Sequence, residues 1–168
     1  MTARFLVASA FFLSLVGLLA AQTKDQKSAA ESSPVRFINP PGLAQNPRYT
    51  HVVEISKGHL VLISGQVAFD KDGNLVGKGD MRAQTTQVFE NLKSALDSVG
   101  ATFNDVVKLN SFLVNMSDNL AAYRDVRAKY LAANRHQPAS TTVGVASLVH
   151  PDLLLEIEAH VVLPDRKK

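Results

Sequence analysis

The chain has 168 residues, of which 46% are hydrophobic and 20% charged, and its formal net charge is +3. This length favours one domain with a single hydrophobic core. The basic residues form no stripe interleaved with aromatic ones, so nucleic acid is not an expected partner. The absence of cysteine excludes disulfides, thiol catalysis and zinc sites built from cysteine.

The N-terminus carries a pattern typical of secretory signal peptides. Arg4 precedes an apolar or small run over 5–20, and Ala21 ends the segment. The alternative is an uncleaved membrane anchor, because the run is only slightly shorter than a membrane span. Cleavage is favoured, which predicts an exported protein, periplasmic or secreted, with no membrane contact after cleavage.

The sequence then divides into segments of different composition. We predict a signal peptide over 1–21, a flexible spacer over 22–33, a single domain over 34–165 and a basic tail over 166–168.

Hydrophobic periodicity in the domain predicts the element order β-β-β-α-β-α-β-β. The expected ranges are 35–38, 51–56 and 59–69 for the first strands, 81–99 for a helix, 106–114 for a strand and 119–133 for a second helix. Two strands follow within 136–163, separated by a bend at His150-Pro151, and the last covers 153–162. Asp80 is expected to cap the first helix, and Ser117 or Asp118 the second.

Two amphipathic helices can cover only one face of a mixed sheet, which predicts an α+β fold with an uncovered sheet face. Strand 59–69 is apolar on both sides, with Leu60 and Leu62 on one and Val61, Ile63 and Val67 on the other. A strand buried on both faces in so small a domain indicates packing against another subunit.

The last strand alternates between an apolar set and a polar set. The polar set places Glu156, Glu158 and His160 on one face, where charged groups need water or a lined cavity. The two carboxylates could form a general acid/base pair. Alternatively, one of them is ion-paired with Lys108 or Arg127 across an interface.

Four short motifs resemble a known family. They are Ile63-Ser64-Gly65-Gln66, Asp105-Val106-Val107-Lys108, Pro138-Ala139 and Leu155-Glu156-Ile157-Glu158-Ala159. From about Val35 to Leu163 the chain resembles the Rid family (RidA/YjgF, L-PSP endoribonuclease-like). The resemblance implies a chorismate mutase-like fold and a homotrimer around a central β-barrel, with clefts at the subunit interfaces. The best-known members hydrolyse 2-imino or enamino acids to 2-oxo acids and ammonia, without a metal or organic cofactor.

The resemblance also implies a set of catalytic residues. Tyr49 matches the family tyrosine before the second strand, Ser64 the serine of the motif, and Glu156 the glutamate that positions water. The family arginine lies in a Pro-Ala-Arg-Ser segment, where this chain has Ser140. A guanidinium binds a carboxylate through two parallel charged hydrogen bonds, whereas a serine offers one neutral donor.

We predict a substrate-binding set of Ser140, Thr142, Arg48 and Gly65. Arg48, directly before Tyr49, could restore a cation near the cleft; the alternative is a solvated loop residue, which is favoured.

Histidines near these positions raise the question of a metal. His51, His160 and Glu158 could together hold one, but scattered histidines on strands are more often structural. No metal and no other cofactor are therefore predicted.

Three functions remain open. The first is a trimeric hydrolase or deaminase acting on C=N bonds, similar to 2-iminobutanoate/2-iminopropanoate deaminases but with altered specificity. The second is a non-catalytic trimer that binds a small metabolite. The third, an endoribonuclease, is the least favoured because the basic character is weak.

Overall fold

The computed structural model describes residues 34–165, and the predicted element order is confirmed there. The strands are β1 Val35–Ile38, β2 Val52–Ile55, β3 His59–Val67, β4 Val106–Val114, β5 Ala139–Val145 and β6 Leu155–Leu163. The helices are α2 Met81–Ser98 and α3 Met116–Tyr130, with a short 3-10 turn η1 at Phe103–Asp105. The predicted signal peptide, spacer and basic tail lie outside the described residues.

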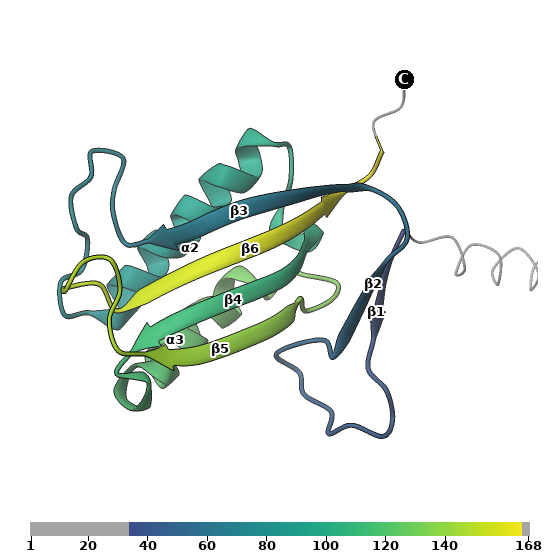
Figure 1. The fold of residues 1–168 in the computed structure, drawn as a ribbon, viewed down its shortest axis with the longest axis horizontal. Helices are drawn as coiled ribbons and strands as arrows, with labels where there is room; N and C mark the ends of the chain where they lie inside the picture. The colour runs from purple at the N-terminus through teal and green to yellow at the C-terminus, as the bar shows by residue number, and fades with distance from the viewer. Residues whose placement is uncertain (1–33, 166–168) are drawn as a thin grey trace, which may run out of the picture. The chain divides into compact units, whose positions relative to one another are not determined.

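The strands form two sheets (Figure 1). β1 and β2 pair antiparallel, and the larger sheet has the order β3-β6-β4-β5. Within it β4 and β5 are parallel, while β6 runs antiparallel to both its neighbours. Both helices lie on one side of this mixed sheet (Figure 1), as the α+β prediction required.

The core lies between the helices and the sheet. The apolar residues of β6, including Leu155, Ile157 and Val161, are fully buried, together with Phe89 and Leu92 of α2. Side chains alternate across a strand, so this burial leaves the polar set of β6 on the opposite face. Burying each large apolar side chain contributes about 1.5–3 kcal/mol to stability.

The face of the sheet opposite the helices is partly apolar. Leu60 and Leu62 of β3 are 60% and 66% exposed, and Val143 of β5 is also exposed. These are the leucines that the sequence assigned to the second apolar side of this strand.

The start of α3 differs from the prediction. The helix begins at Met116, so Ser117 and Asp118 lie in its first turn and do not cap it. Asn115 occupies the cap position with a left-handed φ of 46° and makes no side-chain cap hydrogen bond. Asparagine tolerates this conformation better than most residues, so here the backbone determines the start of the helix. The helix also ends at Tyr130, earlier than the predicted 133.

Asp80 caps α2 as predicted, since its carboxylate accepts hydrogen bonds from the backbone N–H groups of Arg82 and Ala83.

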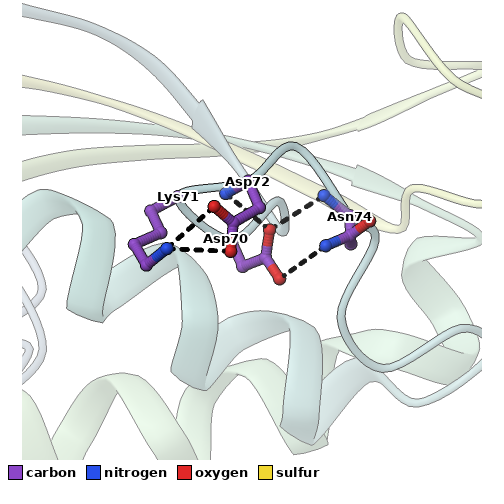
Figure 2. A network of polar contacts seen from close by, with 4 residues as sticks. All are labelled: Asp70, Lys71, Asp72 and Asn74. Atoms are coloured by element: carbon purple, nitrogen blue, oxygen red, sulfur yellow. Dashed lines mark hydrogen bonds and ion pairs between the residues drawn. The ribbon is translucent and has the colours of Figure 1, made fainter.

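A polar turn connects β3 to α2 (Figure 2). The Asp70 carboxylate accepts from the backbone N–H of Asp72 at 2.9 Å and of Asn74 at 2.8 Å, and from the Asn74 side chain at 3.1 Å. The hydrogen bonds from Asn74 are the main reason why the pKa of Asp70 is lowered. Lys71 pairs with Asp72 at the surface. The carboxylate therefore stabilises the turn itself.

Candidate functional site

A cavity of about 170 Å³ lies where the β1–β2 loop, α3 and β5 meet. It is lined by Asn46, Arg48, Tyr49, Tyr123, Arg124, Arg127, Ser140 and Thr142. Since β5 is an edge strand, the cavity lies at the edge of the larger sheet.

The β1–β2 loop is attached to the start of β5. The Thr50 N–H donates to the Pro138 carbonyl at 3.3 Å, and the Thr50 hydroxyl donates to the Gln137 carbonyl at 2.6 Å. From the other side, Nη2 of Arg127 donates to the Arg48 carbonyl at 3.0 Å. These bonds place Arg48 and Tyr49 beside the residues of β5.

Ser140 and Thr142 share the helix-covered side of the sheet. In the β4–β5 register, Ser140 pairs with Leu109 and Thr142 with Ser111. Leu109 is fully buried in the core, and the Ser111 hydroxyl is hydrogen-bonded to the Tyr123 hydroxyl of α3 at 2.8 Å. Paired residues project to the same side, so the cavity opens between β5 and α3.

Arg127 is the most deeply buried charge of the site, with 6% of its surface exposed. Its Nε has no hydrogen-bond partner, and no carboxylate between residues 34 and 165 forms an ion pair with it. Burial lowers the pKa of Arg127, and the nearby Arg124 and Arg48 lower it further, while Tyr123 acts in the opposite direction. The guanidinium nevertheless stays charged, because arginine does not deprotonate in proteins.

A second group of predicted residues lies on β3 and β6. The register between these strands shifts at Ile63 and Gln66, so Ser64 and Gly65 form a bulge. A Cβ added at Gly65 would lie only 1.9 Å from Oε1 of Glu156. The Glu156 carboxylate therefore packs directly against the Gly65 backbone, and any side chain at position 65 would displace it.

These two groups do not meet within one chain. Along β4, Leu109 is the partner of Ser140 and Phe112 is the partner of Glu156. Leu109 and Phe112 are three residues apart on one strand, so they project to opposite faces. The cavity thus brings together Arg48, Tyr49, Ser140 and Thr142, whereas Glu156 projects from the face without helices.

The other polar residues of that face form their own contacts. Asn110 donates to Glu158 at 3.3 Å, and Lys108 donates to the Thr141 hydroxyl at 2.6 Å. Burial lowers the pKa of Lys108. Within the described part of the chain, neither Glu156 nor Glu158 is ion-paired with Lys108 or Arg127.

The alternative of a metal held by His51, His160 and Glu158 has no supporting geometry in the described residues. Among residues 34–165, no group of three or more His, Asp or Glu side chains is arranged to hold a metal ion. His51 instead contacts the Ala44 carbonyl through Nε2 at 2.9 Å and lies edge-on to the Tyr49 ring. It therefore helps to order the loop that carries Tyr49.

No helix in the described residues is long and apolar enough to cross a membrane.

The contribution of α3 to the cavity was not predicted from the sequence. From the sequence, Arg127 was considered only as an ion-pair partner of a glutamate. A usable signal was present, because Arg127 follows the inward-facing Tyr123 by four residues and so lies on the same helix face. A buried arginine normally has a partner of opposite charge, so an arginine on a buried helix face indicates a possible site.

Comparisons with known proteins agree with this architecture. The family model described as Endoribonuclease L-PSP matches residues 42–163. A RutC family protein of Pyrococcus horikoshii is 38% identical over 105 residues, which is 62% of this chain and 80% of the relative. A 2-iminobutanoate/2-iminopropanoate deaminase of Dermatophagoides farinae is 35% identical over 131 residues, which is 78% of this chain and 98% of that protein.

Solved structures are similar over the same region. A Rid family protein of unknown function from Yersinia pestis superposes with a TM-score of 0.71 and 41% identity, covering 78% of this chain and all of that one. Yeast Mmf1 gives a TM-score of 0.57 at 33% identity, covering 77% of this chain and 97% of that one. The fold is thus that of the YjgF proteins, two helices on one face of a mixed sheet. The chain belongs to the Rid family, as its motifs indicated.

Proposed function

We propose that the protein is a Rid-type homotrimer that hydrolyses 2-imino acids or related imines in clefts between its subunits. One observation carries this proposal: Arg48, Tyr49 and Ser140 line one cavity, while Glu156 projects from the opposite face of the sheet. The two halves of such a site come together only when a second copy supplies one of them. The exposed leucines of β3 provide apolar surface for that association.

The reaction needs a bound carboxylate and an oriented water. The cationic cavity would hold the carboxylate of the imino acid, and Tyr49 would help to fix its orientation. Glu156 would accept a proton as water adds to the carbon of the C=N bond, and that proton passes to the nitrogen. The hydroxyl of the resulting carbinolamine then gives up its proton, through Glu156, to the nitrogen as the C–N bond breaks, which releases ammonia and leaves the 2-oxo acid.

Hydrolysis of 2-aminoacrylate, generated in situ, tests this reaction directly. We expect turnover that Glu156→Gln reduces about 10²–10⁴-fold, the usual contribution of general acid–base catalysis. Glu158→Gln is the matched control, because it lies two residues away on the same face. Full activity of Glu156→Gln would exclude Glu156 as the base. Equal losses in both variants would favour the acid/base pair.

The replacement of the family arginine by Ser140 favours a second candidate, a trimer that binds a small metabolite without converting it. In this case a thermal-shift screen would find stabilising carboxylates, and the imine assay would show no turnover. Binding without turnover would assign this function, and turnover would exclude it.

Export is part of the proposal and is supported by the N-terminal sequence pattern alone. We expect the mature protein to begin at Gln22, after cleavage behind Ala21. N-terminal sequencing of protein recovered from the periplasm or medium checks this. A full-length product retained in the membrane fraction would favour the anchor.

A further inference from the structure

Within the described residues of one chain, the cavity contains a buried positive charge without a matching negative one. Arg127 is 6% exposed, its Nε has no hydrogen-bond partner, and its Nη2 donates to a neutral carbonyl of the β1–β2 loop. Buried charges in proteins are normally paired and fully hydrogen-bonded. A guanidinium that lines a cavity and has no carboxylate partner in residues 34–165 is therefore suited to an anionic ligand.

The rest of the cavity lining has the same electrostatic character. Arg48 and Arg124 add two more guanidinium groups, and the other lining side chains are neutral tyrosines, hydroxyls and an amide. No aspartate or glutamate of the described chain lines the cavity. A site with three cations and several neutral donors is complementary to negative charge.

The three arginines of the cavity differ in how deeply they are buried. Arg127 is buried, whereas Arg48 and Arg124 are exposed and so lie nearer to solvent. The planar fork of a guanidinium binds one carboxylate through two parallel hydrogen bonds. One carboxylate beside Arg127 would balance its charge, which leaves the two outer arginines for a second negative group.

Ser140 fits this arrangement through its size. It lines the same cavity as Arg127, and its side chain is short. A cavity of about 170 Å³ has room for a small molecule of a few carbon atoms. A long side chain at position 140 would occupy part of this volume.

We propose that this cavity binds small dicarboxylates, with Arg127 anchoring one carboxylate and Arg48 and Arg124 receiving the other. The inference rests on the proposed function in taking this cavity as the substrate site, and it names the class of substrate. The family arginine would lie on β5, at the position of Ser140, whereas the carboxylate anchor proposed here is Arg127 of α3.

Isothermal titration of the purified protein with succinate, butyrate and inorganic phosphate tests the proposal. Succinate and butyrate both have four carbons and differ by one carboxylate. We expect succinate to bind at least about tenfold more tightly than butyrate. Arg127→Met should remove binding of both acids, and Arg124→Met should reduce succinate to the affinity of butyrate. Arg135→Met is the control, because Arg135 is exposed and outside the cavity, and it should bind like the parent.

Several results would overturn the proposal. Equal affinity for succinate and butyrate would contradict the second anionic subsite. Unchanged succinate binding by Arg127→Met would contradict the anchor. Binding of phosphate without either acid would contradict the carboxylate class.

A second pair of variants keeps the test valid if Arg127→Met does not fold. Ser140→Glu supplies a carboxylate inside the cavity, whereas Ser140→Gln has nearly the same volume and no charge. We expect Ser140→Glu to have a higher Tm than Ser140→Gln and to exclude succinate. Equal Tm values would show that Arg127 does not lack a counter-charge.

Binding is measured with acids that carry no imine, so the two proposals can fail separately. Succinate binding without imine hydrolysis contradicts only the hydrolase. Imine hydrolysis without selective succinate binding contradicts only the dicarboxylate site.

Discussion

At the scale of single residues, Ser140 and Arg127 have to be considered together. Ser140 occupies the place of the family arginine, and taken alone it indicates a lost carboxylate anchor. The structure places Arg127 on the wall of the same cavity, buried and without a carboxylate partner among the described residues. The cavity therefore retains a strong cation on a different element.

Restoring the family arginine is expected to weaken this site. Ser140→Arg would add a fourth guanidinium to a cavity that already has three, and like charges in a partly buried site repel each other. We expect a lower Tm and weaker succinate binding than in the parent, measured by calorimetry. Ser140→Met, which is long but neutral, controls for volume. A gain in turnover or affinity from Ser140→Arg would place the anchor at position 140.

Gly65 supports a prediction about Glu156. An alanine Cβ at position 65 would overlap the Glu156 carboxylate, so Gly65→Ala must displace that side chain. We expect destabilisation of about 1–3 kcal/mol, as for other overpacked sites, measured by denaturant unfolding. Gly42→Ala is the control, because nothing lies within 4 Å of a Cβ there. The conclusion about close packing would be wrong if both variants were equally stable.

Some residues of the candidate site could be predicted from the sequence, and others could not. Tyr49, Ser64 and Glu156 were recognisable from their match to the family, and Gly65 lies in the same motif as Ser64. The site role of Arg127 was not predicted, because it depends on the docking of the β1–β2 loop. That docking uses the backbone N–H and the hydroxyl of Thr50, and both donate to backbone carbonyls, which every residue type carries.

At the scale of elements, an aromatic contact joins the two helices. The Tyr130 ring of α3 stacks on Phe89 of α2 at 4.8 Å, and its hydroxyl donates to Oε1 of Glu90 at 2.5 Å. Burial, assisted by Glu90, raises the pKa of Tyr130 to about 12. The neutral phenol is therefore the form that supports helix packing.

This shift predicts a pH dependence of stability with a defined sign. The folded state holds the Tyr130 proton more tightly than the unfolded state does. Its contribution is therefore complete below the ordinary tyrosine pKa of 10.0 and is lost as the pH rises toward about 12. Absorbance titration of the phenolates should show a late-titrating component that is missing in Tyr130→Phe. Identical titration curves for parent and variant would contradict the shift.

Most elements were predictable from periodicity, and the exceptions have identifiable causes. β1 and β4 match their predicted bounds because breaking residues flank them. The start of α3 was missed because side-chain caps were sought, whereas Asn115 acts through its backbone conformation. The two faces of the last strand were predictable, because its apolar and polar residues alternate strictly from Leu155 to Val161.

At the scale of the whole molecule, the exposed leucines of β3 bear on the proposed trimer. Leu62 is 66% exposed in the single chain, on the strand where the sequence predicted burial on both faces. We expect Leu62→Glu to prevent association and to reduce the mass measured by light scattering from three chains to one. Turnover should be lost with it, because the two halves of the site then remain apart.

Val149→Glu is the matched control for this experiment. Val149 is 82% exposed but lies in the loop before β6 and not on the sheet face. It should leave the mass unchanged. A Leu62→Glu protein that still has the mass of three chains would exclude this part of β3 from the interface.

The hydrogen bond from Arg127 to the Arg48 carbonyl has a consequence for the evolution of this chain. One guanidinium both lines the cavity and holds the loop that carries Tyr49. A substitution at position 127 would therefore alter the charge of the cavity and the position of the loop in a single step. We expect positions 127 and 140 to covary among close relatives, and the loop at 46–50 to change length or composition wherever the arginine is absent.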